Sequence, residues 1–80
     1  MDVSPDELRA RIGARIRELL QRRQMQVSEL AAAANVSRSH LHRIMVGSTA
    51  PSSDVLARLA SALSVDPVAL VRPYRKPPAE

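Results

Sequence analysis

The sequence predicts an all-α fold in which five helices form one compact domain. Apolar residues recur at spacings of three and four along most of the chain, which is the pattern of a helix with one buried face. No segment shows the alternation of apolar and polar residues that is typical of a half-buried strand. With 80 residues, no Phe, no Trp and one Tyr, the chain can form a single domain with a small aliphatic core.

The first helix is expected from Pro5 to Arg23. Ser4 can cap its amino terminus, a proline suits the first helical position, and Glu7 can complete a capping box. Glu18 and Arg22 have the spacing of an ion pair along this helix. The residues expected to face the core are Leu8, Ile12, Ile16, Leu19 and Leu20. The arginines of the other face, interpreted mainly as a solvated surface, are Arg9, Arg11, Arg15, Arg17, Arg22 and Arg23.

Two short helices joined by a tight turn are expected next, from Val27 to Ala34 and from Arg38 to Val46. Asn35 tolerates a left-handed backbone where the first of them ends. Ser37 can cap the second, because its hydroxyl can accept a hydrogen bond from a free helical N–H group. The residues expected to face inward are Leu30, Ala31, Ala34, Val36, Leu41 and Ile44.

A fourth helix is expected after the loop that follows Gly47. Gly47 can end the preceding helix, and Ser52 or Ser53 can cap the next one. Asp54 then lies in the first turn, where the helix dipole favours a carboxylate. The residues expected on the buried face of this helix are Val55, Leu56, Leu59, Ala60 and Leu63.

A short fifth helix is expected to start at Asp66-Pro67, which again combines a cap with a proline, and to end near Val71. We therefore place the folded domain at residues 1–71. Residues 72–80, with the sequence RPYRKPPAE, are charged and rich in proline, so we expect a flexible basic tail.

The distribution of charge indicates a polyanionic partner more clearly than the net charge of +4 does. No Asp or Glu occurs between Glu29 and Asp54. A surface without carboxylates favours nucleic acid, although a chance scarcity of acids in a short chain would give the same pattern. The basic and imidazole side chains within this gap are Arg38, His40, His42 and Arg43.

The helix from Arg38 to Val46 has the two faces that a helix in a DNA major groove needs. Leu41 and Ile44 can face the domain, while polar side chains face away from it. An arginine fork matches the O6 and N7 acceptors of guanine, although solvated surface residues would show the same arrangement. The candidate base-reading residues are Arg38, Ser39, His42 and Arg43.

Nothing in the sequence points to an enzyme, a metal or a cofactor. The chain has no Cys, and His40 and His42 diverge by roughly 200° on a helix, unlike metal-binding pairs four residues apart. There is no G-x-S-x-G or S-x-x-K motif, and two glycines are too few for a phosphate-binding loop. No apolar run approaches the roughly 20 residues that span a bilayer, and the acidic, polar start is unlike a signal peptide. We therefore expect a cytoplasmic protein without a membrane partner.

Six short motifs occur in order along about three-quarters of the chain. They are Ile12-Gly13-x-x-Ile16-Arg17, Ser28-Glu29-Leu30-Ala31, Val36-Ser37-Arg38-Ser39-x-Leu41-x-x-Ile44, Gly47-x-x-x-Pro51-Ser52, Leu59-Ala60-x-x-Leu63-x-Val65, and Leu70. With these motifs the sequence resembles the Cro/repressor-type helix-turn-helix (XRE-like) family of DNA-binding transcriptional regulators. The resemblance implies a compact five-helix, lambda-repressor-like fold with its helix-turn-helix at about residues 27–46.

The resemblance also implies a function. The chain would be a homodimeric, sequence-specific regulator that binds a palindromic operator in double-stranded DNA, with residues 38–46 as the recognition helix in the major groove. The family's base-reading positions fall on Arg38, Ser39, His42 and Arg43. The positions implied for contacts with the DNA backbone are Gln26, Ser28, Ser37, His40, Ser48 and Thr49. The candidate dimer interface consists of Val65, Val68 and Val71, with Tyr74 as a further candidate, although these residues could simply cover the first helix.

The sequence departs from the family at the start of the second helix and at one contact between helices. Val27 replaces a glutamine that many relatives use to bind phosphate. Leu20 and Met45 replace an arginine and a glutamate that pair in many relatives, and we predict that the two apolar side chains touch, because both charges have been lost together. An alternative function follows from these changes. The chain could be a protein-interaction module, such as an antitoxin-like or regulator-partner subunit, that keeps the fold with weak or no DNA binding.

Overall fold

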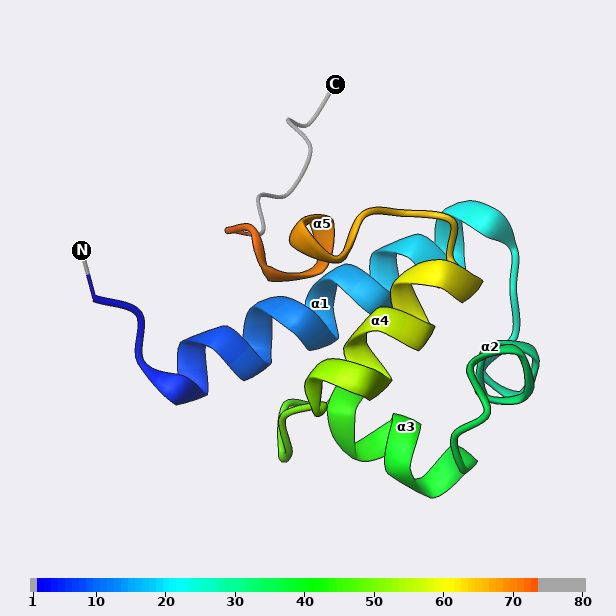
Figure 1. Ribbon diagram of the computed structural model, residues 1–80, viewed down its shortest axis with the longest axis horizontal. Helices are drawn as coiled ribbons and strands as arrows, with labels where there is room; N and C mark the ends of the chain where they lie inside the picture. The colour runs from blue at the N-terminus through cyan, green and yellow to red at the C-terminus, as the bar shows by residue number, and fades with distance from the viewer. Residues whose placement is uncertain (1, 74–80) are drawn as a thin grey trace.

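The computed structural model describes residues 2–73, and this part of the chain forms helices without any strand (Figure 1). The predicted five-helix, all-α fold is therefore confirmed. We predicted that the third helix ends at Val46, but it ends at Met45, and Val46 is its carboxyl-terminal cap. Tyr74 and the rest of the tail to residue 80 lie outside the described residues. The helices are α1 (Pro5–Arg23), α2 (Val27–Ala34), α3 (Arg38–Met45), α4 (Ser53–Ala62) and α5 (Pro67–Val71).

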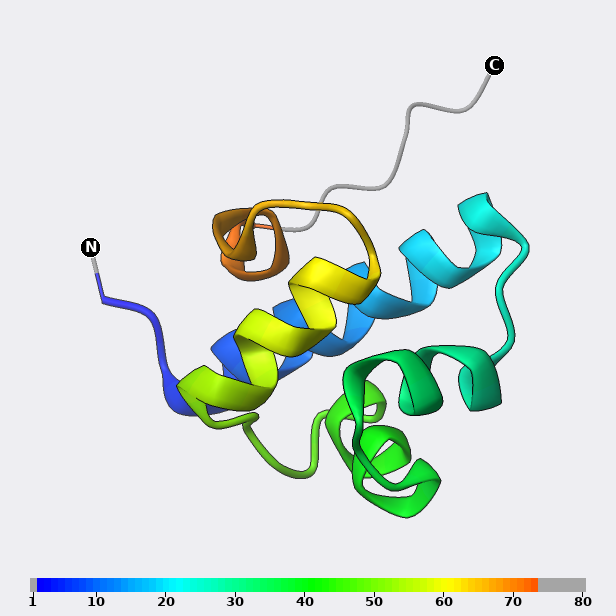
Figure 2. The same ribbon diagram turned by 45° about the vertical axis from the view of Figure 1, so that its right-hand side comes forward.

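The long helix α1 supports two of the four shorter helices directly. Helices α3 and α5 both pack against α1, and they lie on opposite sides of it in both ribbon views (Figures 1 and 2). Helix α2 packs against α3 and α4, and α4 packs against α5. The pair α2 and α3 is therefore held from two directions, by α1 under α3 and by α4 beside α2.

The core is entirely aliphatic, and no polar or charged residue is buried within residues 2–73. Each fully buried Leu or Ile contributes roughly 1.5–3 kcal/mol to folding, so a few such side chains dominate the stability of the domain. Leu8 departs from the prediction, because 37% of its surface is exposed. The first turns of α1 project beyond the other helices, so the buried stripe begins at Ile12 (Figure 1). The largest fully buried side chains are Ile16, Leu30, Leu41, Ile44, Leu59, Leu63 and Leu70.

The predicted caps form at the helix starts. Ser4 Oγ accepts a hydrogen bond from the N–H of the third residue of α1 at 3.0 Å, and Ser37 Oγ does the same for α3 at 3.0 Å. Ser52, one of the two candidates, caps α4 at 3.2 Å. The Asp66 carboxylate accepts from the N–H of Val68 at 2.8 Å. Short polar side chains thus satisfy free amides at four helix starts and fix where those helices begin.

Two predicted side-chain interactions along α1 are wrong. The carboxylate of Glu7 accepts a hydrogen bond from Arg11 instead of completing a capping box with the main chain before α1. Glu18 pairs with Arg15, three residues before it, instead of Arg22, four residues after it. Both spacings bring side chains together on a helix, so the pattern of charges alone does not decide which pair forms.

Candidate nucleic-acid interface

The turn between α2 and α3 sets the orientation of α3 relative to α2. Asn35 ends α2 in the left-handed conformation, with φ of 56°, as predicted. Val36 follows and packs against the core, so the turn is attached to the domain by an apolar side chain. Arg58 of α4 donates a hydrogen bond to the carbonyl oxygen of Asn35 at 3.4 Å. The turn is therefore held from inside by Val36 and from outside by Arg58.

Helix α3 has one buried face and one exposed face. Leu41 and Ile44 have no exposed surface, and they anchor the helix in the core. The side chains on the other face are exposed, and they include all four of the predicted base-reading residues: Arg38, Ser39, His42 and Arg43. A short helix with this division can be held rigidly while it presents polar groups to a ligand.

The carboxyl-terminal end of α3 lies directly against α1. Gly13 allows this approach, because a Cβ at that position would lie 3.0 Å from the carbonyl oxygen of Ile44 and closer still to that of Met45. Arg17, one turn later on α1, donates a hydrogen bond from Nη1 to the carbonyl oxygen of Met45. Leu20 and Met45 both belong to the same apolar cluster, and their direct contact remains a prediction. The main chain of residue 45 therefore has a polar link to α1, whether or not the two apolar side chains touch.

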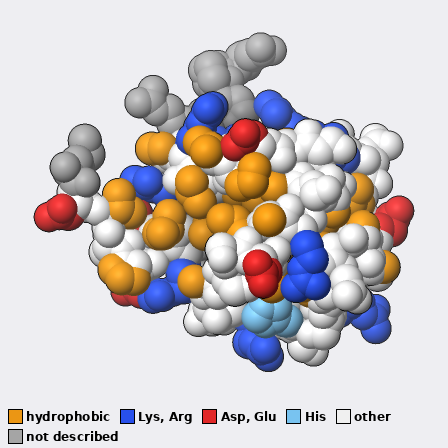
Figure 3. All heavy atoms as spheres, in the orientation of Figure 1, with side chains coloured by type: hydrophobic (Ala, Val, Ile, Leu, Met, Phe, Trp, Pro, Cys, Tyr) orange, Lys and Arg blue, Asp and Glu red, His pale blue; other side chains and the backbone are white. Residues whose placement is uncertain are grey.

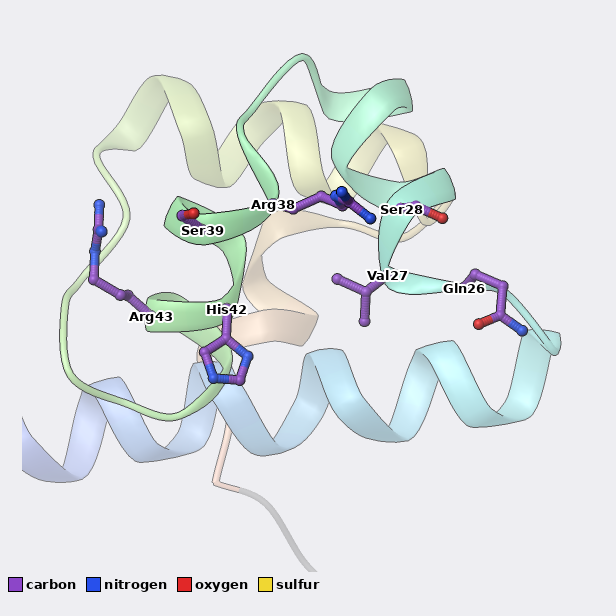
Figure 4. Close-up of a pocket in the computed structure, with 7 residues that line it drawn as sticks. All are labelled: Gln26, Val27, Ser28, Arg38, Ser39, His42 and Arg43. Carbon is purple, nitrogen blue, oxygen red and sulfur yellow. The ribbon is translucent and has the colours of Figure 1, made fainter.

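The exposed face of α3 and the start of α2 enclose one open hollow on the surface (Figure 4). Helix α2 contributes its first residues and the cap before them, and α3 contributes side chains from two successive turns. The structure thus brings together the four predicted base-reading residues and two of the predicted backbone contacts. The lining residues are Gln26, Val27, Ser28, Arg38, Ser39, His42 and Arg43.

The arginines of this hollow have no acidic partner among the described residues. Arg38 forms no hydrogen bond or ion pair with the protein there, and Arg43 Nη2 lies 3.5 Å from Nδ1 of His40. The acid in the first turn of α2, Glu29, has its carboxylate engaged with the N–H of Gln26 at 2.9 Å. Neither guanidinium group is engaged by a carboxylate of the described residues, so both can still bind an external acceptor.

The remaining predicted backbone-contact residues lie outside the lining of the hollow. Ser37 caps α3, and Ser48 Oγ donates to the carbonyl oxygen of Arg43 at 3.1 Å, so both hydroxyls already have a protein partner. His40 and Thr49 are half-buried. Ser37 precedes α3, His40 lies in its first turn, and Ser48 and Thr49 follow it; their role in binding DNA remains a prediction.

The candidate dimer residues differ in exposure. Val65 and Val71 are partly buried and pack against the core, which agrees with a role in covering the domain. Val68, on α5, is 51% exposed. Of the three, Val68 is the side chain with the most free surface to offer a second copy.

Sequence reasoning missed two features of this site. Val27 lines the hollow beside the polar residues, although the sequence marked it only as a departure from the family. Glu29 caps α2 by accepting a hydrogen bond from the Gln26 N–H. The signal for this cap in the sequence was weak, because glutamine is an uncommon residue at the start of a helix.

Among residues 2–73, no group of three or more His, Asp or Glu side chains is placed to hold a metal. No helix in that range is long and apolar enough to cross a membrane.

Comparisons with known proteins agree with this fold. A search of curated proteins gave no match. Among solved structures, the restriction-modification controller protein C.AhdI from Aeromonas hydrophila is 27% identical with a TM-score of 0.74, and the match covers 78% of this chain and 94% of that one. The clp gene regulator ClgR from C. glutamicum is 30% identical with a TM-score of 0.73, covering 79% of this chain and 82% of that one. Residues 11–73 match the family described as "Helix-turn-helix domain". The protein therefore belongs to the helix-turn-helix domain family and has the fold of helix-turn-helix transcription regulators.

Proposed function

We propose that the protein is a sequence-specific regulator of transcription that binds double-stranded DNA with α3 in the major groove. One observation carries the proposal. The four candidate base-reading side chains lie on one exposed face, they line one hollow with the start of α2, and no acidic residue lines that hollow. A DNA duplex is a polyanion whose major groove admits one helix, so this surface matches it in charge and in shape.

The side chains divide into two roles. Arg38 and Arg43 are the guanine readers, since each guanidinium can donate two hydrogen bonds to one base edge. Ser39 and His42, on the same face, contact neighbouring base edges. The residues assigned to phosphates, which position the helix without reading sequence, are Gln26, Ser28, Ser37, His40, Ser48 and Thr49. The solved relatives are described as a restriction-modification controller and a gene regulator, which supports a regulatory role for this chain.

We further propose that two copies bind a palindromic site. Helix α3 has eight residues, so one copy reads only a few base pairs and gains little affinity from them. Two copies related by a two-fold axis would place their recognition helices about 34 Å apart, in successive major grooves. Hydrophobic side chains gather on the side of α1, α4 and α5, away from the histidine at the lower edge (Figure 3). Val68, with Val65 and Val71 at its flanks, is the centre of the proposed interface.

The proposal is tested by selection from a pool of random DNA duplexes at two salt concentrations. The wild-type protein should enrich a sequence with two-fold symmetry. The double variant Arg38→Ala/Arg43→Ala should lose that enrichment, because each bidentate contact with guanine contributes roughly 1–3 kcal/mol of discrimination.

The matched control is Arg9→Ala/Arg11→Ala, which removes the same charge from arginines that pair with acids within α1. This control should enrich the same sequence as the wild type. If the wild type enriches no sequence and both double variants behave like it, a function as a DNA-binding regulator is excluded, and a protein-interaction module becomes the better description.

Sedimentation equilibrium tests whether the protein is a dimer, and Val68→Asp should convert the dimer to a monomer.

A further inference from the structure

Val27 is the apolar member of an otherwise polar surface. It is the first residue of α2, it is partly buried against the core, and the other residues that line the hollow carry amide, hydroxyl, imidazole or guanidinium groups. Figure 4 shows its side chain in the space between Gln26 and the side chains of α3. A ligand that fills the hollow therefore meets one apolar contact among several hydrogen-bonding groups.

The chemistry of the major groove limits what that contact can be. Base edges there carry hydrogen-bond donors and acceptors, and Val27 can satisfy none of them with its side chain. Leaving such a group desolvated against a valine costs free energy. The apolar group in the groove is the C5 methyl of a pyrimidine, which thymine carries naturally and cytosine carries after methylation.

The position of Val27 relative to Arg38 indicates which base of the DNA site would carry this methyl group. Figure 4 shows the Arg38 side chain extending from α3 toward the start of α2, and both residues line the same hollow. Gln26 and Ser28 lie on either side of Val27 in sequence, and their side chains can donate hydrogen bonds to phosphates of the DNA backbone. A methyl group between the phosphate contacts and the guanine bound by Arg38 would face Val27.

We propose that Val27 is a specificity-determining residue that contacts the C5 methyl group of a pyrimidine next to the guanine bound by Arg38. This inference rests on the proposed function, because it requires α3 to lie in the major groove. A valine at this position, where many relatives have a glutamine, would then change the DNA sequence that the protein prefers. It would not merely remove a contact with a phosphate.

The test replaces single methyl groups in the duplex that the wild-type protein enriches. Each thymine is changed in turn to uracil, and dissociation constants are measured for the wild type, Val27→Ala and Val3→Ala. Val3 is the matched control, since it is an exposed valine, 39% accessible, that precedes α1 and lies outside the lining of the hollow. A parallel series changes each cytosine to 5-methylcytosine, which distinguishes the two sources of the methyl group.

In the wild type, one position in each half-site should respond to the methyl group by about fourfold in affinity, the factor expected for burial of one such group. Val27→Ala should lose that response, and Val3→Ala should keep it. The ratio of affinities for the methylated and unmethylated duplexes is taken within each variant, so a partly unfolded variant does not distort it.

The outcomes separate this inference from the function on which it rests. If the wild type enriches no sequence, both are overturned. If it enriches a sequence but no position responds to a methyl group, or the response persists in Val27→Ala, only the role of Val27 is overturned. A response at thymine identifies a site in unmodified DNA, whereas a response confined to 5-methylcytosine identifies a reader of methylated DNA.

Discussion

Helices α1 and α3 both carry arginines, but the two sets have different surroundings. In α1, Arg9, Arg11 and Arg15 each pair with an acid three or four residues away on the same helix. In α3, Arg38 and Arg43 have no acidic partner within the described residues. A count of basic residues would rank α1 first, but three of its six arginines are engaged by carboxylates of the same helix, whereas neither arginine of α3 is.

The physical reason is that ion pairs at a surface act on the electrostatic field more than on stability. An exposed pair contributes only about 0–1 kcal/mol to folding, so the pairs of α1 are not essential to the core. Each carboxylate does, however, cancel the attraction that its arginine would exert on a distant phosphate. The uncompensated arginines of α3 therefore mark the face that is suited to a polyanion.

The largest effect should come from making α3 resemble α1. Ser39→Glu places a carboxylate four residues before Arg43 on an exposed position, where the two can pair. Affinity for the enriched duplex should fall by at least about 100-fold, because Arg43 is engaged and the new charge faces phosphates. Fluorescence anisotropy with a labelled duplex measures the loss.

The control for that variant is Ser61→Glu, which adds the same charge at an exposed position of α4. It should change affinity by no more than a few-fold at physiological salt, where charges farther away than about 8 Å are largely screened. Equal losses in the two variants would mean that overall charge, and not the local surroundings of α3, governs binding.

The next largest effect concerns the contact between the two helices. Gly13→Ala should destabilise the domain by about 1–3 kcal/mol, because the new methyl group would meet the main chain at the end of α3. The sign is informative, since the same change in an exposed helix interior normally stabilises by about 1 kcal/mol. Urea unfolding measures it. A gain in stability would contradict the close packing of α3 on α1.

The sequence predicted those features of the fold that depend on neighbours along the chain. The starts of α1 and α3 follow from Ser4 and Ser37, whose hydroxyls bond amides three residues later. The division of α3 into two faces follows from helical spacing, which places Leu41 and Ile44 together. Local rules were therefore sufficient for the helix starts and for gathering the candidate base readers.

Features that depend on how helices meet were not predicted. Leu8 has the right spacing for the core, but its burial depends on how far α1 extends beyond its neighbours. The left-handed conformations of Gln24 and Ser64 have no strong local signal, because neither residue is specialised for positive φ. Val27 enters the site only through the packing of α2 against α3. Contacts with DNA and with a second copy depend on molecules outside the chain, so they remain predictions.

A smaller effect is expected at the one described arginine of α1 that bonds to α3. Arg17→Ala removes the hydrogen bond to the Met45 carbonyl oxygen, and it should cost about 0.5–1.5 kcal/mol in urea unfolding. It should also weaken binding to the enriched duplex by a few-fold, because the end of α3 loses an anchor. Arg9→Ala, which breaks a contact within α1 alone, should leave binding unchanged. Identical binding by the two variants would show that Arg17 does not position α3.

The smallest effect should come from releasing a paired arginine of α1. Glu7→Gln breaks the pair with Arg11, and it should reduce the free energy of unfolding by at most about 1 kcal/mol, counting the pair and the helix dipole. Affinity for the enriched duplex should rise less than about threefold at physiological salt, and even this gain should vanish at high salt. Titrations at two salt concentrations measure it. A larger gain would mean that Arg11 lies near the DNA when it is unpaired. In that case α1 would carry a second basic surface, which its own carboxylates neutralise in the wild type.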